Sequence, residues 1–258
     1  MRDSWDDRIR RADALAAPPG PAQAILSFYA QLLRIQKDLY ESFRSRRLTG
    51  ELSADATPEM QLAPPLLKMA LAKGPAALRE RAERLLSASA KFDEIVSRYS
   101  YKPDDRDFFG KALLQPYLER LRDDRVRPRY RDHLRGERRC PVCGGAPQLS
   151  ILEEHADTLA SGGRQLQCAN CLNAWTFRRV VCVSCGEEDE AKLGYFQSEE
   201  LPHLRVDSCD TCRRYVKSID LGKLGLAVPI VDEVAGVALD VWATEHGFTK
   251  IELNLIGM

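Results

Sequence analysis

The sequence predicts an α+β protein with an N-terminal α-helical bundle, two tandem metal-binding ribbons and a C-terminal helix. Three observations support this prediction. Apolar residues recur at helical spacing through the first half of the chain. All eight cysteines lie in four C-x-x-C units between residues 140 and 212, and these units form two copies of one spacing. We place the bundle at 1–135, the ribbons at 136–180 and 181–225, and the C-terminal helix and tail at 226–258.

The composition is that of an ordinary globular protein. The 258 residues suffice for one or two domains with a buried core. The 38 Lys and Arg residues balance 38 Asp and Glu, and 44% of residues are hydrophobic, which excludes a fully disordered chain and argues against a polycation that coats nucleic acid. No apolar run approaches the roughly 18–20 residues that cross a bilayer. The Arg10–Arg11 pair precedes Pro18-Pro19-Gly20 instead of an export signal's apolar stretch, so we expect a cytoplasmic protein.

Three apolar stripes and one shorter segment predict a bundle of four or five helices. The shorter helix begins at Pro64-Pro65, runs to Lys73 and is stopped by Gly74-Pro75. Pro116 is expected to kink the last of the long helices. The stripes consist of Ile25, Phe28, Leu32, Ile35, Leu39 and Phe43, then Leu78, Ala82, Leu85, Phe92, Val96 and Tyr99, then Phe109, Leu113, Leu114, Tyr117, Leu118 and Leu121.

A basic segment connects the predicted bundle to the ribbons. Residues 125–139 hold seven arginines against two acidic residues, a net charge of +5. Residues 183–258 hold 14 acidic and 7 basic residues, a net charge of −7. The basic segment is either a solvated linker or a docking surface for an anionic protein, phosphate or nucleic acid.

The cysteine units favour metal-thiolate sites over the other uses of cysteine. Disulfides need an oxidising compartment, and thioredoxin-type pairs occur singly after a strand. Two C-x-x-C turns close a tetrahedron of four sulfurs, and Gly144 and Gly186 allow the positive φ that a tight metal-binding turn often needs. The four units are Cys140/Cys143, Cys168/Cys171, Cys182/Cys185 and Cys209/Cys212.

The repeat indicates which cysteines belong together. The first two units recur 42 and 41 residues later, and each copy encloses an insert that is typical of two strands and a turn. We therefore expect one site from Cys140, Cys143, Cys168 and Cys171, and a second from Cys182, Cys185, Cys209 and Cys212. A cross-braced arrangement, joining the first unit to the third, remains the alternative. The four histidines, His133, His155, His203 and His246, are not needed as ligands and are expected at the surface or as helix caps.

Four thiolates in a tetrahedron suit zinc or a single iron ion, one ion per ribbon. Such a closed set leaves no position for water, so hydrolytic chemistry at the metal is not expected. Structural zinc contributes on the order of 10–16 kcal/mol to the folding of small modules, so the metal's first role is to fold the ribbons.

The C-terminal segment predicts one more helix. Asp232 and Glu233 would lie in its first turn, where acidic side chains interact favourably with the helix dipole. Gly247 is a plausible C-terminal stop. The apolar face would consist of Val234, Val237, Ala238, Val241 and Trp242.

The cysteine segments resemble the bacterial formate dehydrogenase accessory proteins, the FdhE family. The likeness covers about residues 137–250 and rests on CPVCGGAP, LQCANCLNAWTFRRVVCVSCG and DSCDTCRRYVKSIDL followed by VPIVDEVAGVALDVWATEHGF. It implies a non-catalytic maturation factor in the cytoplasm that binds the catalytic subunit of a molybdenum- or tungsten-dependent formate dehydrogenase. It also implies rubredoxin-like iron sites at all eight cysteines. The short polar SGGRQLQ loop departs from the family pattern without touching the cysteines.

Two other functions stay open at this point. A zinc-ribbon nucleic-acid binder could stack bases on Trp175, Phe177 and Tyr215, although the acidic charge beyond Cys182 opposes phosphate binding. An iron-thiolate redox protein would need the same cysteines, but the sequence has no flavin, nicotinamide or haem motif and predicts no catalytic residues. For the accessory role, we expect the loops Glu153–Gly163 and Ser198–Pro202 to face the client.

Overall fold

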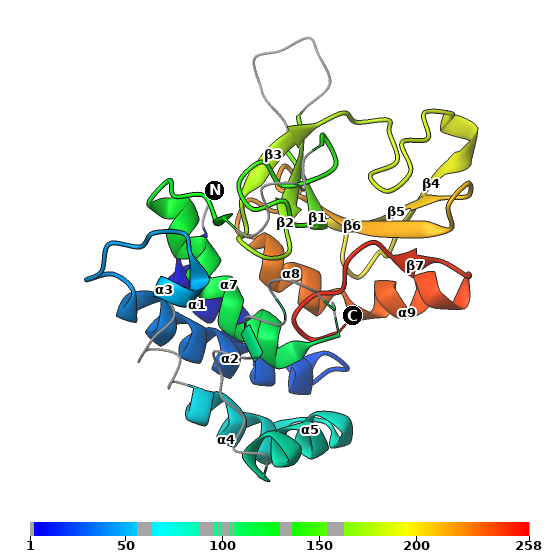
Figure 1. Cartoon of the computed structure of the whole chain (residues 1–258). Helices are drawn as coiled ribbons and strands as arrows, with labels where there is room; N and C mark the ends of the chain where they lie inside the picture. The colour runs from blue at the N-terminus through cyan, green and yellow to red at the C-terminus, as the bar shows by residue number, and fades with distance from the viewer. Residues whose placement is uncertain are drawn as a thin grey trace.

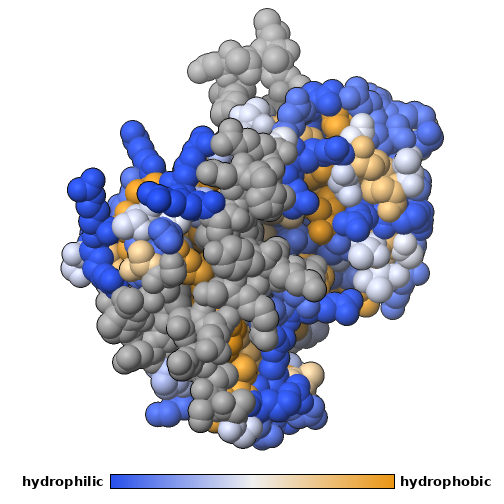
Figure 2. All heavy atoms as spheres, viewed as in Figure 1, coloured by the Kyte–Doolittle hydropathy of each residue, from blue (hydrophilic) through white to orange (hydrophobic). Residues whose placement is uncertain are grey.

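The computed structural model contains a group of N-terminal helices, one mixed sheet and two C-terminal helices that lie against the sheet (Figure 1). None of the helices in the described part of the chain is both long enough and apolar enough to span a bilayer. Figure 2 shows hydrophilic residues over most of the described surface on this face, with apolar residues gathered in small patches. The structure describes residues 3–55, 63–87, 95–96, 99, 104, 106–129, 136–153 and 163–257.

The first half is helical, as predicted, but its described residues form six helices where four or five were expected. Its helices are α1 Trp5–Ala16, α2 Gln23–Ser42, α3 Leu52–Asp55, α4 Ala63–Lys73, α5 Ala76–Ser87 and α7 Phe108–Asp123. Helix α2 packs against α1 and α7, and its buried residues follow the first predicted stripe. Helix α4 contains Pro64-Pro65 at its start and ends before Gly74, as predicted. Pro116 lies within α7, which continues to Asp123.

The second predicted stripe does not form one helix in the part of the chain that is described. Helix α5 carries Leu78, Ala82 and Leu85 and ends at Ser87. Phe92 lies outside the described residues, whereas Val96 and Tyr99 are buried in the core.

Each ribbon is a three-stranded antiparallel unit. The first contains β1 Pro147–Leu152, β2 Arg164–Cys168 and β3 Ala174–Phe177, and the second contains β4 Leu193–Gln197, β5 Leu204–Cys209 and β6 Arg214–Asp220. The two strands predicted inside each insert are thus present. A third strand follows the second cysteine unit of each copy, so the repeat is larger than the cysteine spacing alone indicated.

The two ribbons join into one sheet. Strand β1 pairs in parallel with β6, from Leu149 opposite Lys217 to Leu152 opposite Asp220. The strand order is β3-β2-β1-β6-β5-β4, and the short strand β7 Thr249–Lys250 pairs with β6. An unpaired strand edge exposes backbone N–H and C=O groups, so this pairing satisfies the inner edges of both ribbons.

The C-terminal segment forms two helices where one was predicted. Helix α8 spans Pro229–Ala235 and α9 spans Val237–Glu245, with Gly236 between them. A Cβ at Gly236 would lie 2.9 Å from Leu204 Cδ1, so the chain bends where it meets β5. Helix α9 ends at Glu245, and Gly247 adopts a φ of 77°, in agreement with the predicted stop.

The break changes which residues face the core. Val234 is buried as predicted, but Val241 is 52% exposed and Ala238 is also exposed, whereas Leu239 and Ala243 are buried, so the predicted apolar face was wrong for α9. Asp232 lies in the first turn of α8, as predicted, Glu233 follows it, and both side chains are buried. Helix α8 packs against β1 and β6 on one side and against α1 and α2 on the other. It therefore connects the bundle to the sheet, as Figure 1 shows.

Candidate metal centres

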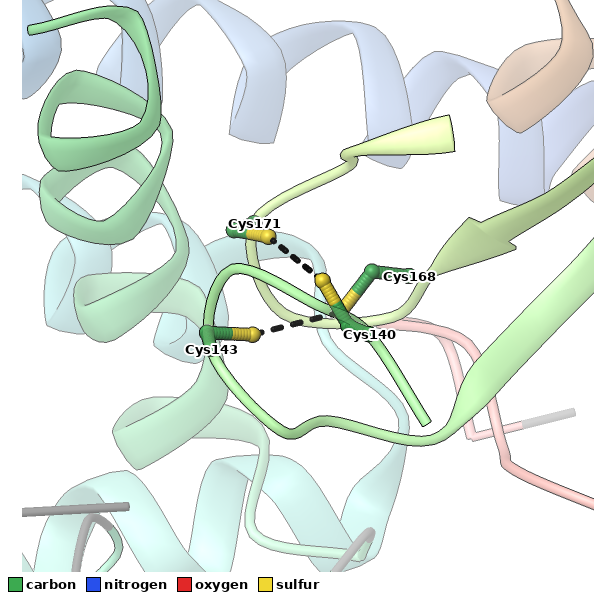
Figure 3. A group of neighbouring side chains, drawn as sticks. All are labelled: Cys140, Cys143, Cys168 and Cys171. Atoms are coloured by element: carbon green, nitrogen blue, oxygen red, sulfur yellow. Dashed lines mark hydrogen bonds between the residues drawn. The ribbon is translucent and has the colours of Figure 1, made fainter. Parts of the chain in front are cut away.

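The first cysteine quartet gathers at one end of β1 and β2. Cys140 and Cys143 lie in the turn before β1, Cys168 ends β2, and Cys171 lies in the following turn. Their Sγ atoms point toward one another (Figure 3), with 3.5 Å from Cys140 to Cys171 and 3.4 Å from Cys143 to Cys168. All four residues are at most 2% exposed.

The second quartet repeats this arrangement at the β4–β5–β6 end of the sheet. Its Sγ distances are 3.7 Å from Cys182 to Cys212 and 3.8 Å from Cys185 to Cys209. Within each quartet all ligand atoms lie within 4.8 Å of one another. Each quartet consists of the two C-x-x-C units of one copy of the repeat, so the predicted grouping of the cysteines is confirmed. The cross-braced alternative, which joined the first unit to the third, is wrong.

Each cysteine turn contains a residue with positive φ directly after its second cysteine. Gly144 and Gly186 have φ angles of 71° and 85°, as the sequence predicted, and Gly144 N–H donates to Cys140 O at 2.9 Å. Leu172 and Arg213 occupy the same position in the other two turns, with φ angles of 52° and 55°. A left-handed conformation is unusual for a side chain of this size, and the residue types alone did not reveal it.

Backbone N–H groups point at the sulfurs. Asn170 N–H donates to Cys168 Sγ at 3.3 Å, and Ser184 N–H donates to Cys182 Sγ at 3.4 Å. Hydrogen bonds of this kind favour the thiolate, which is the form that binds a metal ion. The same turn geometry thus positions the sulfurs and stabilises their charge.

The donor sets fit a tetrahedral metal ion. Metal–sulfur bonds of about 2.3 Å place tetrahedral sulfurs about 3.8 Å apart, close to the distances in the second quartet and slightly longer than those in the first. Burial raises the pKa of Cys168 and Cys171 well above the usual thiol range and that of Cys182 to about 12. A cation at the centre would lower these pKa values and favour the thiolates, because a metal-bound thiol is deprotonated.

One arginine accompanies each quartet. Arg122, on α7, donates from Nη1 to Cys171 O at 2.9 Å, and its cationic charge interacts favourably with the Cys171 thiolate. Arg164, on β2, is 5% exposed, and its cationic charge interacts favourably with the Cys182 thiolate. A zinc ion with four thiolates carries a net charge of −2, which these cations partly offset.

The first quartet also requires glycine beside it. A Cβ at Gly145 would lie 2.8 Å from Cys168 Sγ and 2.6 Å from Asn170 Nδ2. Contacts this close leave no space for any side chain. The Cys-Gly-Gly segment at residues 143–145 therefore has two separate roles, since Gly144 provides the turn conformation and Gly145 provides the space.

Comparisons with known proteins identify the family. The model described as "FdhE, central domain" matches residues 139–179, and that described as "FdhE, C-terminal domain" matches residues 180–256. A protein named FdhE homolog from Aquifex aeolicus is 36% identical over 249 residues, covering 90% of this chain and 86% of the relative. This chain belongs to the FdhE family.

Other relatives extend the match over nearly the whole chain. An FdhE homolog from Haemophilus ducreyi is 29% identical and covers 95% of this chain and 87% of its own. The crystal structure of the FdhE protein from Pseudomonas aeruginosa matches with a TM-score of 0.68 at 24% identity, covering 99% of this chain and 96% of that one. That likeness shows that the FdhE fold extends through the helical half.

The described histidines of this FdhE-family protein lie apart from the quartets. His203 is 7% exposed and its Nε2 lies 2.9 Å from Asp232 Oδ1, so its predicted surface position was wrong. His246 caps α9, with Nδ1 2.7 Å from Trp242 O, as predicted. His133 and His155 lie outside the described residues.

The aromatic residues proposed for base stacking are engaged inside the fold. Phe177 and Tyr215 are buried, and the Tyr215 hydroxyl donates to Asp240 Oδ1 at 2.8 Å. Trp175 is half-buried and its Nε1 donates to Glu137 O at 3.0 Å. These rings do not form an open stacking platform, which removes the main support for the nucleic-acid alternative.

A buried ionic cluster beside α8 was missed from the sequence. Lys217 and Lys250 contact Glu233 and Asp240, and all four side chains are at most 7% exposed. Asn254 Nδ2 donates to Glu233 Oε2 at 2.8 Å. The available signal was an acidic pair seven residues apart within an otherwise apolar helical segment.

Proposed function

We propose that this protein is a non-catalytic accessory factor that binds the catalytic subunit of formate dehydrogenase and is needed for that enzyme's activity. Membership of the FdhE family and the resemblance of the cysteine segments support this role. The observation that carries the proposal is the pair of closed cysteine quartets, each built into the sheet. Four sulfur ligands fill a tetrahedron, which suits a site that shapes a binding surface rather than one that binds substrate.

All eight cysteines act as metal ligands in this proposal, with two ions per chain. The donor set accepts either zinc or iron, since both bind tetrahedral thiolates. The resemblance to rubredoxin-like sites favours iron. A ferric tetrathiolate site is coloured and a zinc site is not, so the visible spectrum of protein purified without oxygen distinguishes the two.

The proposed place of action is the cytoplasm, where thiols are kept reduced and available for metal binding. All eight cysteines are free in the structure, with sulfurs at non-bonded distances. Reduced thiols are the state that this role requires.

The surface near the second ribbon is available to a client. Glu199, Glu200 and Pro202 of the predicted Ser198–Pro202 loop are exposed. The five described arginines of the basic segment, Arg125, Arg127, Arg129, Arg138 and Arg139, are also exposed. Residues 154–162 of the other predicted loop lie outside the described residues, as do residues 130–135 of the basic segment.

The proposal is tested in the native host grown under conditions that induce formate dehydrogenase. A tagged chain should co-purify the catalytic subunit, and deletion of the gene should abolish formate dehydrogenase activity while the subunit is still made. Complementation with the Gly20→Ala variant should restore activity, because nothing lies within 4 Å of a Cβ at that position. Recovery of no formate dehydrogenase subunit, together with unchanged activity in the deletion strain, would overturn the proposal.

A further inference from the structure

The two quartets differ in their access to solvent. The first is buried throughout, whereas in the second only Cys182 and Cys209 are buried, Cys212 is half-buried and Cys185 is exposed. We infer that the second quartet accepts an external thiolate in place of Cys185, as the first step in passing on its metal ion, while the first quartet retains its ion. This inference rests on the proposed function, in which both quartets bind metal.

The first quartet is held between the sheet and the helical half. Gln115 Nε2 and Arg122 Nη1, both on α7, donate to Ala169 O and Cys171 O at 3.0 and 2.9 Å. Tyr99 donates from its hydroxyl to Asn170 Oδ1 at 3.3 Å. An external ligand can reach these sulfurs only if α7 separates from the turn. Buried polar groups would then lose their partners, which makes such an opening rare.

The turns of the second quartet have exposed contacts instead. Thr211 Oγ1 donates to Glu187 Oε2 at 2.6 Å, and Arg138 Nη1 donates to Ser184 O at 2.7 Å, both at the surface. Water competes with hydrogen bonds of this kind, so their loss has little effect on the core. Cys185 can therefore move away from the quartet while β5 and β6 stay in place.

Exchange at Cys185 conserves charge and electrons. With an ion bound, an incoming thiol would lose its proton to solvent and take the ligand position that Cys185 leaves. Cys185 then takes a proton from solvent, and the oxidation state of the metal does not change. Cys182, Cys209 and Cys212 would hold the ion during this step, and the same exchange at these three cysteines would complete its transfer to the acceptor.

Arginine side chains gather beside the two buried cysteines of the second quartet. A hollow of about 180 Å³ is lined by Cys182, Cys209 and the arginines Arg164, Arg179 and Arg205. Its carboxylate, Asp207, forms ion pairs with Arg164 and Arg205 at 3.4 and 2.8 Å. These arginines lie beside the buried Cys182 and Cys209, whereas the exposed Cys185 is followed by the acidic segment Glu187–Glu190.

A second hollow adjoins the same turn. It has a volume of about 630 Å³ and is lined by Val183, Ser184 and the exposed arginines Arg138, Arg139 and Arg214. Arg214 also lines the first hollow, so the two hollows adjoin. A polypeptide that carries a cysteine could therefore approach the second quartet along an arginine-lined surface.

The inference is tested on the full-length chain loaded with two zinc ions, by following zinc release to a chromophoric chelator. We expect two phases of one ion each, with rate constants that differ at least tenfold. The Cys185→Ser variant should lose the fast phase and keep the slow one. Its matched counterpart in the first quartet, Cys171→Ser, should lose the slow phase and keep the fast one. A single rate for both ions, or loss of the slow phase in Cys185→Ser, would overturn the inference. Failure of the wild-type chain to bind two zinc ions would instead contradict the proposed function.

Thiol footprinting supplies a readout that does not depend on how the variants fold. Zinc-loaded wild-type protein is treated with iodoacetamide and mapped by peptide mass spectrometry, and Cys185 should be modified first and the first quartet last. Glutathione and the purified formate dehydrogenase catalytic subunit, at equal thiol concentration, then serve as alternative acceptors. Acceleration of the fast phase by either supports thiolate exchange and identifies its source. Acceleration by neither, or earlier modification of the first quartet, would overturn the inference.

Discussion

Arg11 on α1 and Asp232 on α8 form a two-pronged ion pair, with Nε to Oδ2 at 3.0 Å and Nη2 to Oδ1 at 2.5 Å. These residues are 221 positions apart and link the first helix of the bundle to the helix beneath the sheet. Asp232 is 1% exposed and also contacts His203 Nε2 and accepts from Val228 N–H. One carboxylate thus holds three segments together.

Replacement of Asp232 by alanine should destabilise the protein by about 3 kcal/mol, because the change leaves buried polar partners without their counter-charge. The urea midpoint should fall with little change in slope. Asp13→Ala is the matched control, since Asp13 pairs with Arg34 at 2.6 Å but both side chains are about half exposed. Its effect should stay below about 1 kcal/mol. Equal losses in the two variants would contradict the assigned role of Asp232.

The carboxylate of Glu233 should make stability depend on acid pH. Burial opposes its ionisation, but Lys217 and Lys250 lower its pKa from 4.5 to about 2. The unfolded chain therefore binds a proton at higher pH than the folded chain does. Stability from this group is complete above pH 5 and declines as the pH falls toward 2.

The Glu233→Gln variant should lose on the order of 2–3 kcal/mol at pH 7 and show a flatter decline between pH 5 and 2. Denaturant titrations of both proteins across this range test the prediction. Metal content is measured at each pH, and the two proteins are compared at equal metal occupancy. The remaining difference in stability is then the contribution of the Glu233 carboxylate. Parallel pH profiles for the two proteins would show that Glu233 does not contribute as described.

Substitution of Gly145 by alanine should weaken the first metal site, since the new methyl group would meet Cys168 Sγ at 2.8 Å. Overpacking of this kind typically destabilises by about 1–3 kcal/mol. We expect metal affinity at the first quartet to fall about tenfold or more, as measured by competition with a chelator. Gly20→Ala serves as the control, and similar affinities in the two variants would refute the steric role.

The cysteine spacing predicted the candidate metal sites well because the signal is local and repeated. Cys140 to Cys143 and Cys182 to Cys185 lie within single turns, and the duplication indicated which turns close together. The different exposure of the two quartets could not be predicted, because it depends on α7 covering only one of them.

The parts of the fold that were missed arise from long-range packing. The pairing of Leu149 with Lys217 depends on two strand edges that meet only in the folded chain. Gly236 lies between α8 and α9 against Leu204, a contact that helical periodicity does not encode. The burial of His203 was missed because its partner Asp232 lies 29 residues away in the sequence.

The most direct test of the central claim is the metal content of the protein purified without oxygen, measured by elemental analysis. Wild-type protein should contain two ions per chain, and Cys140→Ala and Cys182→Ala should each contain one. Two ions retained in either variant, or both ions lost from Cys182→Ala while the first ribbon remains folded, would contradict two independent cysteine quartets.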